Sequence, residues 1–241
     1  MNWLIAGKSG SGKTHLTSTA RQPILCHSFD PQGCALPCIE SLVAEHKYIV
    51  LNQCEFDDAR APQAFQRYTQ QFGELLKAGL FNHLGTYAID GLTGLADTIL
   101  YEIMRKKGQP GEQPKLPDYY TFKEVLKNVI TKCVNLPCDF ILVSHIANNK
   151  DEVTGEILRH LFVSGQSAEK LPSYFGEYYL ATTETIGTKE QRFTLVTKPY
   201  NGYDCKTRIG SGIFELREVA DLTALRGKAK RSTTHLPPLQ L

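Results

Sequence analysis

Residues 7–14 read GKSGSGKT, a complete match to the phosphate-binding pattern G-x-x-x-x-G-K-[ST]. Glycines at positions 7, 10 and 12 let the backbone wrap with its N–H groups pointing inward, and the dipole of a following helix adds positive potential. In this pattern Lys13 reaches the β- and γ-phosphates, and the Thr14 hydroxyl is a ligand of Mg²⁺. The pattern predicts a site for ATP with Mg²⁺, held by Gly7, Lys8, Ser9, Gly10, Ser11, Gly12, Lys13, Thr14 and His15.

The sequence around this loop supports the same interpretation. Residues 2–6 form an apolar run typical of a buried strand, and residues 13–21 follow as a helix. A chance match in a chain of this length has odds on the order of one in a hundred, before a strand and a helix are required on its two sides. An ordinary glycine-rich turn is therefore the disfavoured alternative.

A second acidic position fits the same chemistry. Asp90 ends the apolar run TYAID, where a carboxylate can hold the magnesium ion through water. The alternative is a helix cap, because Asp90 precedes Gly91, Leu92 and Thr93. Since Gly91 follows directly, the glutamate that many helicases place beside this aspartate is missing, and any catalytic acid must lie elsewhere.

The elements that must position these residues alternate along the chain. Short apolar runs predict strands at 2–6, 24–29, 48–52, 86–90 and 140–143, and periodic segments between them predict helices at 13–21, 37–46, 61–78, from 92 and from 118. Such alternation predicts an α/β fold with a mainly parallel sheet and helices on both faces. Residues 177–185 and 192–200 alternate polar with apolar around Gly187, which predicts a C-terminal antiparallel hairpin.

Composition predicts one domain, residues 1–225, followed by a tail. Four of the 27 Lys and Arg residues lie in the last sixteen positions with no acid among them, so the rest of the chain carries two more acids than bases. The tail, RGKAKRSTTHLPPLQL, has no apolar periodicity and predicts disorder over residues 226–241. Seven irregularly spaced cysteines indicate reduced thiols, and no membrane span or leader is evident, so we expect a cytoplasmic protein.

Six motifs follow one another along the chain: GKSGSGKT, ILCHSFDPQG, TYAIDGLTGLADTIL, FILVSHIANNKDEVTGE, LPSYFGEYYLA and TKPYNGYDCKTR. Their order resembles the RecA-like P-loop core. The similarity extends from about residue 2 to residue 222 and is strongest to compact phage-encoded ATPases grouped with the Sak-type single-strand annealing and recombination proteins. For a phage-encoded member the expected location is the host cytoplasm.

The resemblance assigns three further residues to catalysis. The residue that orients the attacking water follows the second strand, which points to Gln32, with Asp30 before it. A glutamine can position water but cannot accept its proton, so hydrolysis is slow, assigned to Asp30, or lost. His145 occupies the place of a sensor for the γ-phosphate; a core histidine bonded to backbone is the alternative.

The resemblance also implies partners. The polar stretch after His145 corresponds to a DNA-binding loop and contributes Lys150, Arg159 and His160; a solvated hairpin is the alternative. Lys206 and Arg208 resemble a basic pair that some ring or filament ATPases insert into a neighbouring subunit's nucleotide, and they could equally be plain surface charges.

Two functions remain open on these grounds. The first is a DNA-dependent ATPase of recombination, annealing or replication that binds single-stranded DNA as a homo-oligomer, with a single-strand binding protein as a possible partner of the tail. The second is a nucleotide-gated oligomeric module that binds DNA or protein with little hydrolysis. A small-molecule kinase is disfavoured, because the chain ends in a hairpin and CKTR instead of an arginine-bearing lid.

Overall fold

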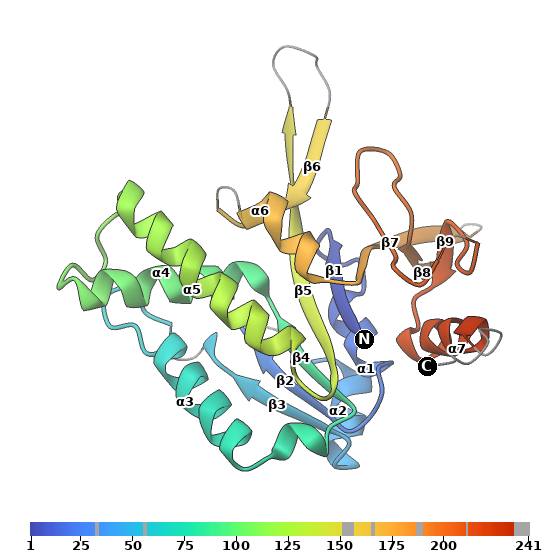
Figure 1. Ribbon diagram of the computed structural model, residues 1–241, viewed down its shortest axis with the longest axis horizontal. Helices are drawn as coiled ribbons and strands as arrows, with labels where there is room; N and C mark the ends of the chain where they lie inside the picture. The colour runs from blue at the N-terminus through green and yellow to red at the C-terminus, as the bar shows by residue number, and fades with distance from the viewer. Residues whose placement is uncertain are drawn as a thin grey trace, which may run out of the picture.

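A mixed β-sheet forms the centre of the molecule (Figure 1). The computed structural model describes residues 1–31, 34–54, 57–150, 157–164, 167–186, 190–210 and 212–233. Within these ranges the sheet has nine strands. They are β1 (Asn2–Gly7), β2 (Ile24–Ser28), β3 (Tyr48–Asn52), β4 (Thr86–Asp90), β5 (Asp139–Lys150), β6 (Ile157–Leu161), β7 (Glu177–Ile186), β8 (Glu190–Val196) and β9 (Arg217–Val219).

The strand order is β3-β2-β4-β5-β1-β7-β8-β9, with β6 paired to the far end of β5. The six strands from β3 to β7 are parallel, whereas β7–β8, β8–β9 and β5–β6 are antiparallel. The predicted α/β fold with a mainly parallel sheet and an antiparallel hairpin is confirmed.

Helices cover both faces of this sheet because its strands are apolar on both sides. In β1, Leu4 packs among one group of buried side chains and Trp3 and Ile5 among another. The first group includes residues of α3 (Ala64–Lys77), α4 (Leu92–Lys106) and α5 (Leu116–Val134), and the second includes residues of α1 (Lys13–Ser18), α2 (Pro37–Ala44) and α7 (Leu222–Thr233). Shorter helical turns are α6 (Ser167–Lys170), η2 (Leu80–Asn82) and η3 (Leu171–Tyr174).

Strand β5 is longer than its apolar run predicts. It leaves the sheet after His145 and continues to Lys150, pairing with β6 from Ile146↔Leu161 to Lys150↔Ile157. The polar stretch after His145 is thus a hairpin that projects beyond the sheet (Figure 1). A pattern of apolar residues ends where burial ends, so it cannot show a strand that continues into solvent.

The prediction of disorder from residue 226 was wrong for the first half of that segment, because α7 extends to Thr233. Leu222, Leu225 and Ala229 are buried at helical spacing, so the apolar stripe crosses the predicted boundary and is hidden when the tail is considered alone. Arg226 adds an ion pair with the buried carboxylate of Asp139. Residues 234–241 lie outside the described residues.

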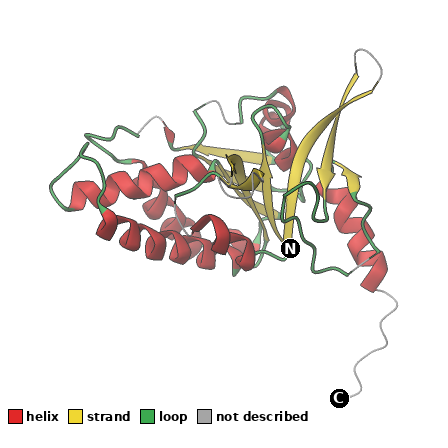
Figure 2. Cartoon of the chain, turned by 90° about the horizontal axis from the view of Figure 1, so that it is seen from above, coloured by secondary structure: helices red, strands yellow, loops and turns green. Residues whose placement is uncertain are grey.

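Seen from above, α7 lies at the β8–β9 end of the sheet, apart from α3, α4 and α5 (Figure 2). Within the ranges given above, none of the helices combines the length and apolar character that spanning a membrane requires.

Candidate nucleotide-binding site

Strands β1 and β4 end at the same edge of the sheet, where β5 between them turns away, and together they define the site. In the parallel register, Gly7 of β1 lies opposite His145 of β5, and Asp90 of β4 lies opposite Val143 of β5. Strand β5 therefore separates the phosphate-binding loop from the strand that carries Asp90. Carboxyl ends of parallel strands are where open α/β sheets bind ligands.

The loop after β1 adopts a conformation that its glycines make possible. Gly10 and Gly12 have φ angles of 75° and 80°, in the left-handed region. At Gly7 a Cβ atom would lie 2.4 Å from the Ser11 hydroxyl oxygen and 2.7 Å from the Ala181 carbonyl oxygen, so any side chain there would displace backbone. Lys13 is buried, and its ammonium group donates a hydrogen bond to the Lys8 carbonyl at 2.7 Å.

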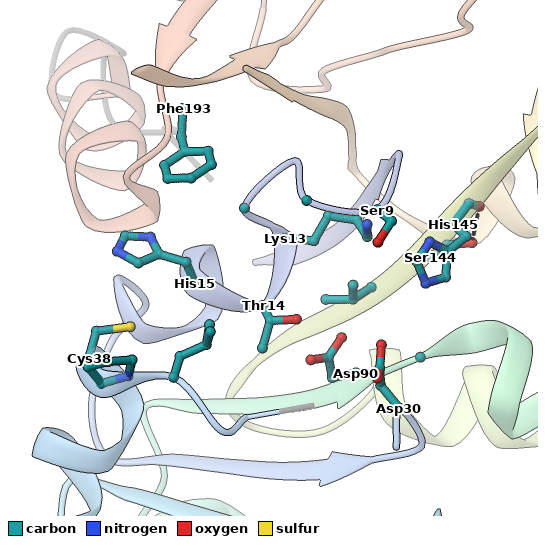
Figure 3. Close-up of a pocket in the computed structure, with 16 residues that line it drawn as sticks. Ser9, Lys13, Thr14, His15, Asp30, Cys38, Asp90, Ser144, His145 and Phe193 are labelled. Atoms are coloured by element: carbon teal, nitrogen blue, oxygen red, sulfur yellow. Dashed lines mark hydrogen bonds between the residues drawn. The ribbon is translucent and has the colours of Figure 1, made fainter. Parts of the chain in front are cut away.

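A cavity of about 650 Å³ opens beside this loop (Figure 3). The predicted residues Lys13, Thr14, Asp90, Asp30 and His145 all contribute to its wall. The remaining wall residues include Ser9, Gly10, Gly12, His15, Leu36, Pro37, Cys38 and Phe193. Residues of the loop, of α1 and α2, and at or near the ends of the buried parts of β2, β4 and β5 thus line one cavity.

Charged groups in this cavity are largely buried. Burial lowers the pKa of Lys13, and the nearby carboxylates of Asp90 and Asp30 oppose that shift. Burial also raises the pKa of Asp90 to about 6, against a hydrogen bond with Thr14. Each group is therefore held in a setting that disfavours its own charge and favours a partner of opposite charge. A phosphate chain and a cation supply those partners.

The residues present fit a magnesium ion. Asp90 is 1% exposed, and its Oδ2 atom has no hydrogen-bond partner among the described residues. A buried acceptor without a donor is unfavourable unless a cation or water meets it. Thr14 and Asp90 are the residues that would hold Mg²⁺, which would neutralise phosphate charge when bound. Clusters of three or more His, Cys, Asp or Glu side chains suited to a metal do not occur in the described ranges.

His145 lies where β5 turns away from the sheet. Its carbonyl oxygen accepts hydrogen bonds from the Ser144 hydroxyl at 2.8 Å and from the Phe162 N–H at 2.9 Å, which fix the backbone at this point. Its side chain lines the cavity, and burial, followed by the charge of Lys13, lowers its pKa. A neutral imidazole in this place can donate or accept a hydrogen bond. Gln32, the predicted water-orienting residue, lies outside the described residues.

Phe193 is a wall residue of this cavity that the sequence analysis does not predict, whereas its partner His15 belongs to the predicted site. Phe193 of β8 stacks on His15 of α1, with ring centroids 5.8 Å apart and planes inclined by 24°. Phe193 also lies so close to Gly12 that a Cβ atom there would be 2.6 Å from the ring. Because Phe193 reaches the loop only through the pairing of β7 and β8, no local signal marks it.

The model of a family described as an AAA domain matches residues 1–209. The chain belongs to this AAA domain family. Its loop and fold make it a RecA-like P-loop ATPase domain, as the order of motifs predicts. No curated protein matches the chain.

Three solved structures illustrate what this AAA domain is similar to in fold. A KaiC-like protein from Pyrococcus horikoshii OT3 is 14% identical, with 81% of this chain and 77% of that chain covered and a TM-score of 0.42. Flagellar accessory protein FlaH from Methanocaldococcus jannaschii is 8% identical, with 86% and 81% covered and a TM-score of 0.38. An ATPase of the type III secretion system of pathogenic bacteria is 14% identical, with 75% and 51% covered and a TM-score of 0.46.

The basic pair near the end of the AAA domain does not line the cavity. Lys206 pairs with Tyr178 through both backbone hydrogen bonds, on the edge of β7 that faces away from β1. Tyr178 lies opposite Leu4 of β1, three residues before the loop begins. Lys206 and Arg208 therefore lie towards the amino-terminal ends of β1 and β7, away from the loop. The backbone N–H of Arg208 donates to the Glu177 carboxylate at 3.2 Å.

The predicted DNA-binding residues of the AAA domain lie on the projecting hairpin. Arg159 and His160 belong to β6, and Lys150 ends β5, although the side chain of Lys150 lies outside the described part of the chain. Arg159 extends across to the loop that joins β8 to β9, where its guanidinium donates a hydrogen bond to the Asn201 carbonyl. The structure thus separates the predicted residues into a nucleotide site, a hairpin and a distant basic pair.

Proposed function

We propose that this protein is a DNA-dependent ATPase that binds single-stranded DNA as a homo-oligomer and acts in phage-type recombination, annealing or replication. The observation that carries the proposal is the single cavity in which Lys13, Thr14 and Asp90 meet. Its charges are arranged for a triphosphate with Mg²⁺, and Asp30 and His145 lie in the same wall as groups that can contact water or phosphate.

Support for a link to DNA comes from β5. The same strand carries His145 in the nucleotide cavity and then forms the projecting hairpin with Arg159 and His160. A displacement of His145 on contact with phosphate therefore has a direct covalent route to the hairpin. Support for an oligomer comes from Lys206 and Arg208, which lie away from their own cavity, so any role in hydrolysis requires a neighbour's nucleotide.

The test is phosphate release from ATP, measured with and without single-stranded DNA. We expect release that DNA stimulates in the parent protein and a loss of roughly 100-fold or more in Lys13→Ala, because the ammonium contacts the charge that develops on phosphate. Lys127→Ala, which removes an exposed lysine on α5, is the matched control and should behave as the parent. Unchanged turnover in a folded Lys13→Ala variant would refute the site.

A second function is favoured by Gln32, which cannot accept a proton from water. In that case the protein is a nucleotide-gated module in which ATP binding orders an oligomer without appreciable turnover. The two functions differ in the same assay, combined with sizing of the protein with and without ATP. Assembly that depends on ATP with negligible phosphate release, with or without DNA, would select the module.

A further inference from the structure

A second cavity, of about 410 Å³, lies on the other side of the phosphate-binding loop. Figure 1 shows its surroundings: the β5–β6 hairpin stands beside the segment that joins β8 to β9, beyond the end of β1. Six residues give the cavity its chemical character, and we call it the arginine–tyrosine cavity after them. They are Lys8, Ser9, Arg159, Tyr200, Tyr203 and Arg217.

The two arginines of this cavity are held against aromatic rings. The Arg159 guanidinium lies 5.0 Å from the centre of the Tyr203 ring, and the Arg217 guanidinium lies 5.1 Å from that of Tyr200. Arg159 is further fixed by the Asn201 carbonyl, and Arg217 by an ion pair of 2.5 Å with Glu184. No acidic residue is among the described residues that line the cavity. Both guanidinium groups are thus held in place by contacts within the protein.

This combination suits a flexible polyanion that carries flat rings. Lysine and arginine side chains can contact backbone phosphates, while bases stack on tyrosine rings or on guanidinium planes. Tyr200 is 39% exposed, so part of its ring surface is open to a base. A compact anion such as free phosphate would use the charges but would gain nothing from the two rings.

We propose that the arginine–tyrosine cavity binds a segment of single-stranded DNA, with phosphates at Lys8, Arg159 and Arg217 and bases stacked at Tyr200 and Tyr203. This inference rests on the proposed function and places the strand between the hairpin and the β8–β9 segment. The hairpin contributes one side of the site through Arg159, and the other cations come from outside it.

The position of the cavity also links it to the nucleotide. Ser9 and Gly10 line both cavities, so one loop is the wall between them. Lys8 lines the arginine–tyrosine cavity, and its backbone carbonyl accepts the hydrogen bond from the Lys13 ammonium. A nucleotide phosphate that attracts the Lys13 ammonium therefore competes with the hydrogen bond between that ammonium and the Lys8 carbonyl. The affinity for DNA accordingly depends on whether ATP is bound.

The test uses a fluorescently labelled thymidine oligonucleotide and the full chain, titrated with and without ATP. Tyr200→Ala combined with Tyr203→Ala should weaken binding by about 30-fold or more, since two stacking surfaces are lost. Tyr200→Phe combined with Tyr203→Phe should retain most of the affinity. Tyr120→Ala, which removes an exposed tyrosine of α5, is the control and should bind as the parent does.

A second measurement addresses charge. The affinity for DNA falls with salt, so the slope of log affinity against log salt is negative. Arg159→Gln and Arg217→Gln should each make this slope shallower by about 0.7, the value for one phosphate contact on a single strand. Thermal unfolding of every variant checks folding, and Tyr200→Ala alone, at an exposed position, provides a variant that disturbs packing least.

The outcomes separate the two proposals. If the parent binds the oligonucleotide and the alanine and glutamine variants match it in affinity and salt slope, the strand lies elsewhere and the cavity proposal is overturned. Equal weakening by Tyr120→Ala would overturn it as well. If the parent binds no single-stranded DNA with or without ATP, the proposed function itself fails and the cavity proposal falls with it.

Discussion

At the residue scale, the nucleotide site keeps two opposite charges in surroundings that favour neither. Lys13 and Asp90 are 6% and 1% exposed. The Lys13 ammonium is directed to a backbone carbonyl, and one carboxylate oxygen of Asp90 has no donor among the described residues. Buried groups of this kind favour a ligand that carries both a cation and an anion.

Asp90→Asn tests this arrangement. We expect the Mg²⁺ concentration needed for half-maximal nucleotide binding to rise by about 10- to 100-fold. This is the usual effect of losing a group that binds a metal ion through the metal's water ligands. Nucleotide binding in the absence of Mg²⁺ should change little, because the loop and Lys13 are intact. A magnesium titration, with calorimetry to verify folding, measures both. A curve that coincides with the parent's would remove Asp90 from the metal site.

Residues whose role is local could be predicted from the sequence. The glycines, Lys13 and Thr14 are adjacent in the chain, and Asp90 ends an apolar run, so short windows contain the information. Phe193 and His15 could not be paired this way, because strand pairing across the sheet brings them together. The role of Gln32 stays a prediction, since that residue lies outside the described part of the chain.

At the element scale, His27 of β2 is buried between helix and sheet. Its Nδ1 atom lies 2.9 Å from the Tyr87 hydroxyl, and Tyr68 contacts its ring edge-on at 5.0 Å. Burial lowers the pKa of His27 from 6.5 to about 3. Between pH 6.5 and about 3, the imidazole of His27 is protonated in the unfolded chain but neutral in the folded chain. Stability therefore falls as the pH drops from about 6.5 towards 3.

His27→Gln should remove this contribution. In the parent, His27 alone lowers the free energy of unfolding by about 1.4 kcal/mol for each unit by which the pH drops within that window. The variant should show a correspondingly shallower pH dependence, although it starts from lower stability because packing against Tyr68 is altered. Urea unfolding at several pH values measures the slope. His83→Gln, at an exposed position, is the control; equal slopes in parent and His27→Gln would contradict the assignment.

Helix α7 supplies the next prediction, because Arg226 pairs with a carboxylate inside the sheet. Asp139 is 2% exposed and also meets the N-terminal amine of Met1. Arg226→Met keeps the apolar stem but removes the charge, so unfolding should require about 1–3 kcal/mol less, the usual loss for a charged hydrogen bond. Lys127→Met, which breaks an exposed pair on α5, should change stability by less than about 0.5 kcal/mol. Equal effects would indicate that residues after 225 are not part of the folded domain.

Elements were predictable where periodicity and burial coincide. Strands β1 to β5 and helices α3, α4 and α5 follow apolar runs or stripes, and the structure places elements there. Strand β6 (ILRHL) and the outer half of β5 (IANNK) mix apolar with polar residues and show no continuous apolar run, so their mutual pairing defines them. Helix α7 was missed since only Leu222, Leu225 and Ala229 carry its stripe.

At the scale of the whole molecule, the arrangement of charges bears on assembly. Lys206 and Arg208 lie beside Tyr178 and Glu177, on the edge of β7 that faces away from β1. Burial, and to a smaller extent the positive charge of Arg208, lowers the pKa of Lys206. A negatively charged partner would therefore stabilise the pair. Neither residue lines its own nucleotide cavity. The nucleotide of a neighbouring subunit is the partner that the proposed oligomer offers.

If the pair acts on a neighbour, Lys206→Ala with Arg208→Ala should keep ATP binding but lose about 1000-fold in DNA-stimulated turnover, the effect of a cation supplied to transferring phosphate. Lys127→Ala with Lys132→Ala, which removes two cations from α5, is the control for net charge. The decisive measurement mixes the double variant with Lys13→Ala. Each is inactive alone, but a mixed oligomer contains interfaces where an intact loop from one subunit meets an intact basic pair from the other. Turnover should then return in part. Should the two proteins co-assemble and the mixture stay as inactive as its components, Lys206 and Arg208 do not serve a neighbour's nucleotide.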